Sequence, residues 1–212
     1  VVLGTINELM KKFPHFNIKQ VEVPFDFDGK LFGKRTGFCI PSNKARALNW
    51  GLSFMSDKVD FCVFFDAEDH PDPNSLIEVA FRYLSDKSKK MFQGPIFQVR
   101  NLWNISNFSK IAALTQALSH EFYLPLIMEK IPFLGGTNLF IHRDILLRLR
   151  GFNSDSNTED LDFGIRSYLF CNVWPVFLPC PTTEQTPSSI KAYLHQRRRW
   201  ALGQLKAIRY IK

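Results

Sequence analysis

Apolar positions along the chain follow two periods, that of a strand and that of a helix, and the two alternate. The run from Val59 to Phe65 is rich in β-branched and aromatic residues, so it predicts a buried strand that ends at Asp66. A turn follows, in which Asp72 is a suitable helix N-cap and Pro73 a suitable first helical residue. Apolar residues then recur at the spacing of one helix face, at Leu76, Val79, Ala80, Tyr83 and Leu84. This strand, turn and helix form the clearest unit in the sequence.

Similar units extend over the rest of the chain. We expect further strands at 21–23, 96–99, 138–141 and 173–178. We expect further helices after Ser42, over 108–129 as one long or broken helix, after Thr158, and after Ser188 or Ser189 as a basic last helix. Strands that alternate with helices are typical of an α/β fold. No repeat or linker interrupts the pattern, so a single domain over residues 1–212 is the expected organisation.

Composition and charge narrow the class of protein. With 212 residues, 45% of them hydrophobic and 21 of them Phe, the chain can bury a sizeable core, which excludes a disordered protein. The net charge of +7 favours an anionic partner such as a nucleotide, a nucleic acid or an acidic membrane surface. The four cysteines form no C-x-x-C pair, so we expect free thiols in the cytosol. The longest apolar runs are far shorter than the roughly 18 residues that a membrane span requires.

Three carboxylates follow directly after the first predicted strand, in the segment Asp66-Ala67-Glu68-Asp69. Ligands of open α/β sheets bind beyond the carboxyl ends of the strands. Three carboxylates in that place suit a hard divalent cation that bridges a diphosphate. A solvated acidic turn before the next helix explains the same residues, and the segment alone does not decide between the two interpretations.

Other motifs also have both a functional and a structural interpretation. The segment Thr158-Glu159-Asp160 places two acids in the first turn of a helix, where the helix dipole favours them whether or not they act in a site. The segment from Gln196 to Trp200 holds three adjacent arginines, of which one or two can face phosphates while the rest meet solvent or lipid headgroups. Gly135-Gly136 precedes a strand as a tight turn does, and Lys44 fits an ordinary helix surface.

Taken together, these motifs resemble those of the family 2 glycosyltransferases. In order they are Lys44-Ala-Arg-Ala-Leu-Asn49, Asp66-Ala-Glu-Asp-His-Pro71, Gly135-Gly-Thr137, Thr158-Glu-Asp160 and Gln196-Arg-Arg-Arg-Trp200. The chain looks most like the membrane-embedded branch of cellulose, chitin and hyaluronan synthases and related bacterial β-glycan synthases. The resemblance runs from about Val21 to the end of the chain. It implies a GT-A type α/β fold, with a mixed, mostly parallel sheet, that binds a nucleotide sugar.

The resemblance also implies the catalytic and metal-binding residues. Asp66 and Glu68 match the first and second acids of the family's D-x-D motif, which holds Mg²⁺ or Mn²⁺, and Asp69 can share that role. Asp160 matches the general base of the T-E-D motif. Glu159 beside it would raise the pKa of Asp160 by like-charge repulsion.

A set of substrate-binding residues is implied in the same way. Gln196, Arg199 and Trp200 match the Q-x-x-R-W motif, which resembles the part that holds the diphosphate and the acceptor end of the glycan. Gly136 and Thr137 fall where the family lines the acceptor site, and Lys44 belongs to the first matching motif. The implied reaction is an inverting transfer from a nucleotide sugar, UDP-linked, to a growing β-linked polysaccharide. We expect no nucleic-acid partner, because acidic motifs occupy the strand ends.

One departure from the family concerns its beginning. The family starts with a strand, a tight turn and acidic residues that grip the uracil ring, and nothing before Val21 matches them. Either the first strand has been cut away, or this copy has lost part of its nucleotide site. The second case leaves a catalytically inactive nucleotide-sugar-binding or scaffold module as the alternative function.

The family's membrane helices are also absent from the chain, so we expect a fragment of a membrane protein whose catalytic domain lies on the cytoplasmic side. The last predicted helix, 189–212, would then lie at the membrane face and direct Arg199 and Trp200 into the active site. Its apolar stripe would contain Ile190, Leu194, Ala201, Leu205 and Ile208, and its basic flank Arg197, Arg198, Lys206, Arg209 and Lys212. Ordinary packing against the core explains the same stripe.

Overall fold

The computed structural model describes residues 2–207, with side chains from residue 6 onward. Ile208, Arg209 and Lys212, which we expected to continue the two faces of the last helix, lie outside the described residues. The helices are α1 (Val2–Lys12), α2 (Lys44–Leu52), α3 (Ser75–Ser85), α4 (Asn107–Leu118), α5 (Leu124–Met128), α6 (Arg143–Arg148), α7 (Glu159–Cys171) and α8 (Ile190–Ala207). A 3₁₀ turn spans Leu102–Asn104 and a π-helical turn spans Ser119–Tyr123.

Four strands form the main sheet, in the order β1 (Phe61–Phe64), β5 (Leu139–His142), β3 (Met91–Gln93) and β6 (Val176–Phe177). A smaller sheet has the order β2 (His70–Pro71), β7 (Thr182–Thr183) and β4 (Ile96–Phe97). Both sheets are mixed, as expected for this α/β fold. In the main sheet, β1, β3 and β6 point the same way, and β5, which lies between β1 and β3, runs antiparallel to both.

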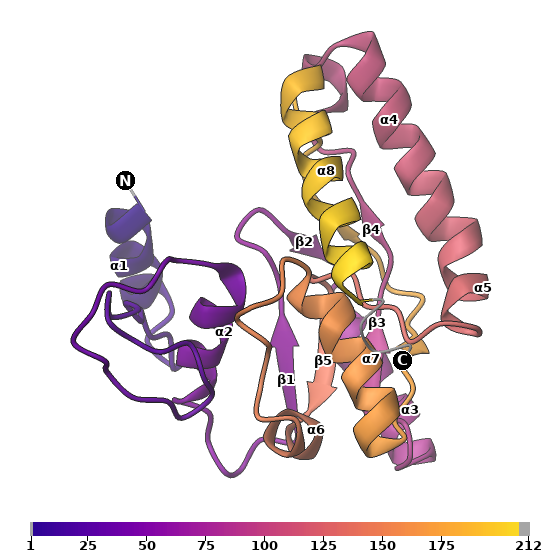
Figure 1. Ribbon diagram of the computed structural model, residues 1–212. Coiled ribbons are helices and arrows are strands. Elements are labelled where there is room, and N and C mark those ends of the chain that lie inside the picture. Colours follow the sequence, from indigo (N-terminus) through magenta and orange to yellow (C-terminus); the bar gives the residue numbers. More distant parts are fainter. Residues whose placement is uncertain (1, 208–212) are drawn as a thin grey trace.

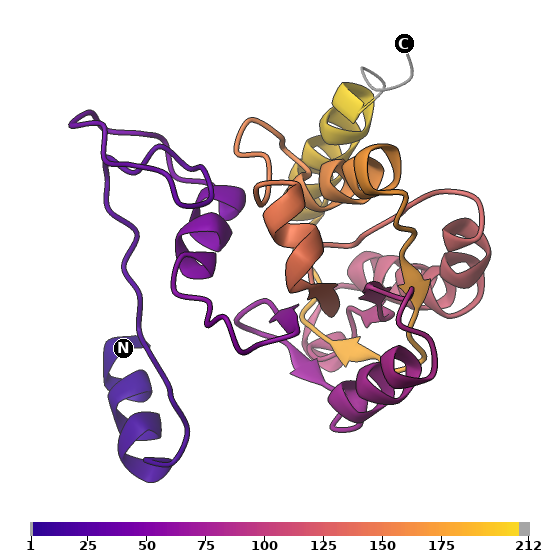
Figure 2. The same cartoon turned by 90° about the horizontal axis from the view of Figure 1, so that it is seen from below.

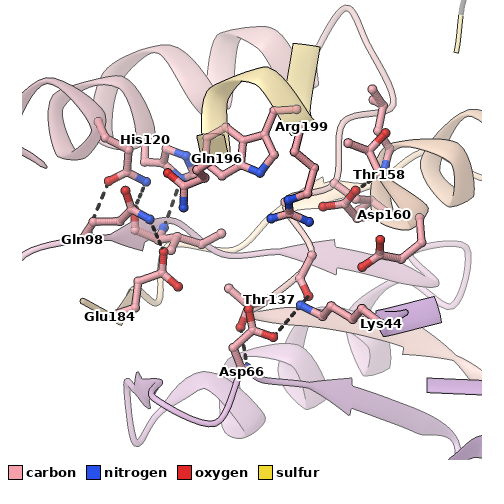
Figure 3. A pocket seen from close by; sticks show the side chains of 18 of the residues that line it. Lys44, Asp66, Gln98, His120, Thr137, Thr158, Asp160, Glu184, Gln196 and Arg199 are labelled. Carbon is pink, nitrogen blue, oxygen red and sulfur yellow. Dashed lines mark hydrogen bonds and ion pairs between the residues drawn. The ribbon is translucent and has the colours of Figure 1, made fainter. Parts of the chain in front are cut away.

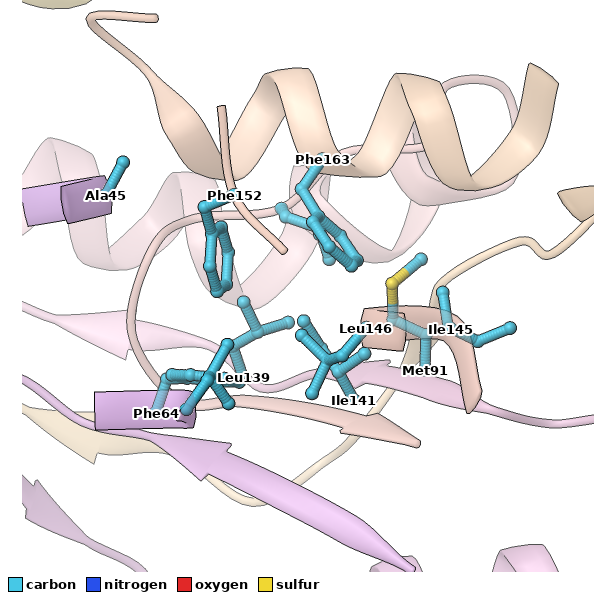
Figure 4. Close-up of a cluster of buried hydrophobic side chains, with 11 residues drawn as sticks. Ala45, Phe64, Met91, Leu139, Ile141, Ile145, Leu146, Phe152 and Phe163 are labelled. Atoms are coloured by element: carbon cyan, nitrogen blue, oxygen red, sulfur yellow. The ribbon is translucent and has the colours of Figure 1, made fainter. Parts of the chain in front are cut away.

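The central strand β5 explains how the sheet is buried on both faces. Its four side chains are all buried, and the first three alternate between two hydrophobic clusters. Leu139 and Ile141 face a cluster formed with α2, α6 and α7, while Phe140 faces a smaller one formed with α3. The larger cluster contains Phe64, Phe152 and Phe163 (Figure 4). Burial of each such Phe contributes roughly 2 kcal/mol to the free energy of unfolding. Helices packed on both faces therefore hold the sheet in place behind the strand ends.

Helices α4 and α8 lie side by side at the end of the sheet where the acidic turn follows β1 (Figure 1). Helix α7 contacts both α6 and α8. Helix α1 lies apart from the sheet in both views (Figures 1 and 2). In residues 2–207, no helix combines the length and the apolar character that crossing a membrane requires. All four cysteines are free, as expected.

Most of the predicted elements are present, with local differences. The helix predicted over 108–129 is continuous from α4 through the π-helical turn to α5. Helix α2 is capped by Asn43 rather than Ser42, since the Asn43 side chain accepts the N–H of Arg46. The N-cap position of α3 is Asn74 rather than Asp72, whose carboxylate instead accepts the N–H of Asn74.

Several segments differ from the prediction in type. Residues 21–23 form no strand, and Thr158 occupies the N-cap position of α7 without a side-chain capping hydrogen bond. The hydroxyl of Ser189 accepts the N–H of Ala192 at the start of α8, as predicted for one of the two serines. Strands β2, β3 and β7 and helices α1 and α6 were not predicted.

Candidate active site

A cleft of about 480 Å³ opens between the end of β1, the start of α7, and helices α4 and α8. Ten of the predicted site residues line it, from segments far apart in the sequence (Figure 3). They are Lys44, Asp66, Glu68, Gly136, Thr137, Glu159, Asp160, Gln196, Arg199 and Trp200. Asp69, which we expected among the metal ligands, does not line it. The fold therefore gathers all the predicted motifs at one place.

The acidic turn after β1 is held by Asp69 from behind. The backbone N–H of Asp66 donates to the Asp69 carboxylate at 2.8 Å and to the Thr137 hydroxyl at 3.1 Å. The Thr137 hydroxyl donates to the same Asp69 oxygen, Oδ2. Asp69 thus fixes the turn to the segment just before β5. To share a metal ion with Asp66 and Glu68, its carboxylate would have to face the cleft, and it does not.

Lys44 connects three parts of the cleft. It is the first residue of α2, and its ammonium group forms an ion pair with Asp66. The same nitrogen donates to the carbonyl of Gly136 at 3.0 Å. Its positive charge also favours the charged form of Asp160. Lys44 therefore orients the Asp66 carboxylate and lies within electrostatic reach of both acidic motifs.

Asp160 is half-buried at the start of α7, one residue after the buried Glu159. Burial, together with the negative charge of Glu159, raises the pKa of Asp160 to about 6. A hydrogen bond from the N–H of Leu161, at 2.8 Å, acts in the opposite direction. A carboxylate with this pKa is ionised at neutral pH and is still basic enough to accept a proton.

The backbone at Gly136 and the carboxylate of Asp160 approach each other closely. The φ of Gly136, +80°, is in the left-handed region, which glycine adopts without strain. A β carbon at this position would lie 2.6 Å from the Oδ2 atom of Asp160. The backbone conformation therefore favours glycine here, and a larger residue would push the Asp160 carboxylate from its position.

Helix α8 forms the wall above the acidic turn. Arg199 extends from it into the space between Asp160 and Asp66 (Figure 3). Trp200 lines the cleft, and the guanidinium group of Arg197 lies over its ring at 4.3 Å and over that of Tyr193 at 4.7 Å. Arg197 thus supports Trp200, while Arg199 faces the open cleft, where it can meet an anionic ligand.

Helices α7 and α8 meet at a close contact. A β carbon on Gly203 would lie 2.3 Å from the Cγ2 atom of Thr158, the residue that precedes α7. Only a glycine allows this approach. The contact sets the distance between the helix that carries Asp160 and the helix that carries Arg199 and Trp200.

The donor set for a divalent cation consists of the carboxylates of Asp66 and Glu68 at the cleft. Within residues 2–207, no group of three acidic, histidine or cysteine side chains gathers to hold a metal. Mg²⁺ is commonly held by one or two carboxylates together with phosphate oxygens of a substrate and water. Asp66 and Glu68 therefore fit a cation that arrives with a diphosphate, and not one enclosed by protein ligands.

Several polar residues of the cleft were not predicted from the sequence. Among them are Gln98, Gln116, His120 and Glu184. Burial, together with the charges of Asp69, Asp66 and Glu68, raises the pKa of Glu184 to about 7. Burial, together with the charge of Arg197, lowers the pKa of His120 to about 4. No motif contains these four residues. The expected strand at 96–99 includes Gln98, and the expected helix over 108–129 includes Gln116 and His120, but neither pattern marks them as site residues.

Comparison with known families identifies the class of protein. Residues 61–212 match the family described as "Glycosyl transferase family group 2", so the chain belongs to this family. The matched region contains the acidic turn, Asp160 and the α8 motif, and begins after Lys44.

Three curated relatives are similar to most of this chain. The UDP-forming cellulose synthase catalytic subunit of Dictyostelium discoideum is 30% identical over 217 residues, covering 92% of this chain and 20% of the relative. Probable glycosyltransferase YdaM of Bacillus subtilis (strain 168) is 28% identical over 165 residues, covering 76% of this chain and 38% of the relative. Probable glucomannan 4-beta-mannosyltransferase 14 of Arabidopsis thaliana is 26% identical over 189 residues, covering 84% of this chain and 33% of the relative. The chain therefore spans between a fifth and two fifths of the length of these relatives.

Among solved structures, the chain is similar to glucosyl-3-phosphoglycerate synthase from Mycobacterium tuberculosis in complex with Mg²⁺ and UDP. The TM-score is 0.43 at 12% sequence identity, covering 73% of this chain and 50% of that one.

Proposed function

We propose that the cleft transfers a sugar from a nucleotide sugar, UDP-linked, to the growing end of a β-linked polysaccharide. The observation that carries the proposal is the position of Asp160, whose pKa of about 6 suits a general base, in the same cleft as Asp66, Glu68 and Arg199. Membership of the glycosyltransferase family supports the reaction class. The names of two relatives, a cellulose synthase and a mannosyltransferase, support a hexose donor and a β-linked product.

In the proposed reaction, Asp160 accepts the proton of an acceptor hydroxyl. The oxygen of that hydroxyl forms a bond to the anomeric carbon of the donor sugar while the bond from that carbon to the diphosphate breaks. The electron pair of the broken bond leaves with the nucleoside diphosphate. A single displacement of this kind inverts the configuration, so an α-linked donor gives a β-linked product. Glu159 supports the step by raising the pKa of Asp160.

The diphosphate would bind between Arg199 and the acidic turn. The planar guanidinium group of Arg199 can hold two phosphate oxygens at once. Asp66 and Glu68 would hold a Mg²⁺ or Mn²⁺ ion, and Lys44 and the hydrogen bonds of Asp69 would keep the turn in place. When bound, such an ion offsets the negative charge that the diphosphate gains as the glycosidic bond breaks.

We further propose that the chain acts at a membrane, with the cleft on the cytoplasmic side, in the manner of the cellulose synthase-like branch. Support comes from α8, where Ile190, Leu194 and Leu205 are exposed on the same helix as the exposed basic residues Lys191, Arg198 and Lys206. Exposed apolar side chains beside basic ones are typical of a helix at lipid headgroups. The acceptor glycan and the flanking membrane segments would complete the enzyme.

The test is a transfer assay on the purified protein, with UDP-glucose, UDP-N-acetylglucosamine and GDP-mannose as alternative donors. We expect release of the donor's nucleoside diphosphate, UDP for a UDP-sugar, that requires Mg²⁺ or Mn²⁺, stops with chelator, and falls at least tenfold in the variant Asp66→Asn, which removes one charged ligand. NMR of the product should show a new β linkage. UDP binding without any turnover would overturn the proposal in favour of an inactive nucleotide-sugar-binding module.

A further inference from the structure

The cleft has a second polar wall that the proposed mechanism does not use. Gln98, His120 and Glu184 lie on one side of the cleft, and Asp160 lies on the other (Figure 3). We propose that these three side chains form a subsite that binds the hydroxyl groups of an uncharged sugar residue of the acceptor. The inference rests on the proposed function and adds the residues that select the acceptor.

His120 reaches this wall because of the π-helical turn at Ser119–Tyr123. Such turns insert one extra residue into a helix and frequently occur at functional sites. The Nδ1 atom of His120 accepts the backbone N–H of Ile96 at 3.1 Å. A backbone N–H can only donate, so Nδ1 carries no proton and the neutral ring carries its proton on Nε2.

The Nε2–H group of His120 is available to a ligand. Within residues 2–207, no hydrogen bond reaches Nε2. The lowered pKa of His120 keeps the ring neutral at physiological pH. The wall therefore offers a fixed, uncharged donor at this point.

Gln98 and Glu184 form a rigid pair beside it. Gln98 is only 4% exposed, and its side-chain amide donates to the Oε1 atom of Glu184 at 2.6 Å. The backbone of Glu184 is fixed on both sides, since its N–H donates to Phe97 and its carbonyl accepts from Arg100. Gln116 holds Gln98 in turn, by accepting its backbone N–H at 3.2 Å.

The chemistry of this wall fits a sugar better than a phosphate. His120 donates from a neutral ring, and the carboxyl group of Glu184, held by Gln98, presents oxygen atoms that accept. Each sugar hydroxyl also donates and accepts, so neutral partners can satisfy it without the cost of burying a charge. Arg197, whose charge acts on His120, has its guanidinium group over the rings of Tyr193 and Trp200.

The substitution His120→Asn isolates the proposed donor. The Oδ1 atom of asparagine can take the place of Nδ1 and accept the N–H of Ile96, whereas nothing replaces Nε2–H. In titrations with UDP and Mg²⁺ present, we expect cellobiose or β-1,4-mannobiose, whichever binds the wild type, to bind about tenfold more weakly, the effect of one hydrogen bond. The affinity for UDP should stay within about twofold. His195→Asn, on the exposed side of α8, is the matched control and should change neither affinity.

Two variants of Glu184 test whether its role is neutral hydrogen bonding. Glu184→Gln keeps the size and the acceptor for Gln98, so disaccharide affinity should stay within about threefold. Glu184→Met removes both polar atoms and should weaken disaccharide binding by about tenfold. A complete loss in Glu184→Gln would instead show that the charge matters and would overturn the subsite.

The outcomes separate this inference from the proposed function. Absence of UDP binding and of transfer in the wild type would overturn both. Transfer by the wild type with an unchanged acceptor KM in His120→Asn and Glu184→Met would overturn the subsite alone. A lower melting temperature in these variants without a change in disaccharide affinity would show that the residues only support the fold, and would also overturn it.

Discussion

The Oδ2 atom of Asp160 lies 2.6 Å from the point where a β carbon on Gly136 would be. The turn before β5 and the first turn of α7 are thus in direct contact, and the glycine determines how deep the carboxylate can sit. The two motifs that carry these residues are separated by 24 positions in the sequence, from 136 to 160. Their contact brings the two motifs into one site.

Gly136→Ala should therefore displace Asp160 and impair transfer. A displacement of about 1 Å can reduce the rate of a catalysed reaction by about a hundredfold, and we expect a loss of that order. The matched control is Gly37→Ala, because Gly37 has nearly the same φ, +78°, and no atom of the described residues lies within 4 Å of the added carbon. Gly37→Ala should cost about 1–2 kcal/mol of stability through backbone strain and leave transfer intact. Equal losses of transfer in both variants would show that strain, and not contact with Asp160, is responsible.

Asp160→Asn should abolish proton acceptance while leaving UDP binding nearly unchanged. General-base catalysis contributes about 10²–10⁴ to a rate, so kcat should fall by that factor while the Kd for UDP stays constant. In the wild type, transfer should increase as the pH rises through about 6, because only the ionised form of Asp160 accepts a proton. A variant that keeps most of the wild-type rate would exclude Asp160 as the base.

The raised pKa of Asp160 also has a consequence for stability. In an unfolded chain an aspartate releases its proton near pH 4, whereas in the folded protein Asp160 keeps it until about pH 6. Between these values the folded state binds more protons, so the contribution of Asp160 to the free energy of unfolding falls as the pH rises from 4 to 6. Asp160→Asn should thus melt at a higher temperature than the wild type at pH 7, and the difference should shrink towards pH 4. A difference that is the same at both pH values would contradict the raised pKa.

Arg199→Lys should reduce transfer with little effect on folding. Arg199 is exposed at the cleft, so its replacement leaves no buried cavity. Lysine keeps the charge and loses the planar pair of donors, a change expected to cost about 10- to 100-fold in kcat/KM. Arg198→Lys is the matched control, since Arg198 is exposed on the same helix and does not line the cleft. Equal rates for the two variants, at saturating donor and metal, would mean that Arg199 does not hold the diphosphate.

Gly203→Ala should separate α7 from α8. The added carbon would collide with Thr158, and a shift of α8 would move Arg199 and Trp200 away from Asp160. We expect a lower melting temperature and reduced transfer, both partly restored by adding Thr158→Ala. Gly51→Ala, at an open position in α2, should instead stabilise the protein by about 1 kcal/mol, the difference in helix propensity. Stabilisation by Gly203→Ala as well would show that the two helices are not held at this contact.

Segments with a clear run or period of apolar residues were predictable from the sequence, whereas some short segments without one were not. The strand before Asp66 stands out as a run of β-branched and aromatic residues, and the helix over 108–129 is long enough to be recognised from its apolar positions. Strand β3 has three residues, all buried, including the polar Gln93, so it shows no alternation. Helix α6 has six residues, fewer than two turns, which is too short for a helical period.

The motifs that form the candidate site were predictable from the sequence, but the role of each residue within them was not. Asp66 and Asp69 look equivalent in the sequence, and only the fold turns one towards the cleft and the other towards Thr137. Glu184 lies in an irregular segment after β7, and its surroundings come from Gln98, 86 positions earlier. Such partners depend on tertiary contacts that local pattern does not encode.

The π-helical turn also restricts how the length of this chain can vary. A helix rotates by about 100° for each residue, so deleting one residue from Ser119–Tyr123 would turn α4 and α5 relative to each other by that angle. Either His120 would leave the cleft, or the core residues Leu124 and Met128 would face solvent. Substitutions on the outer face of α4 are tolerable, whereas insertions and deletions here are not. Natural variants of this protein should therefore differ freely in composition along the helix while preserving its residue count.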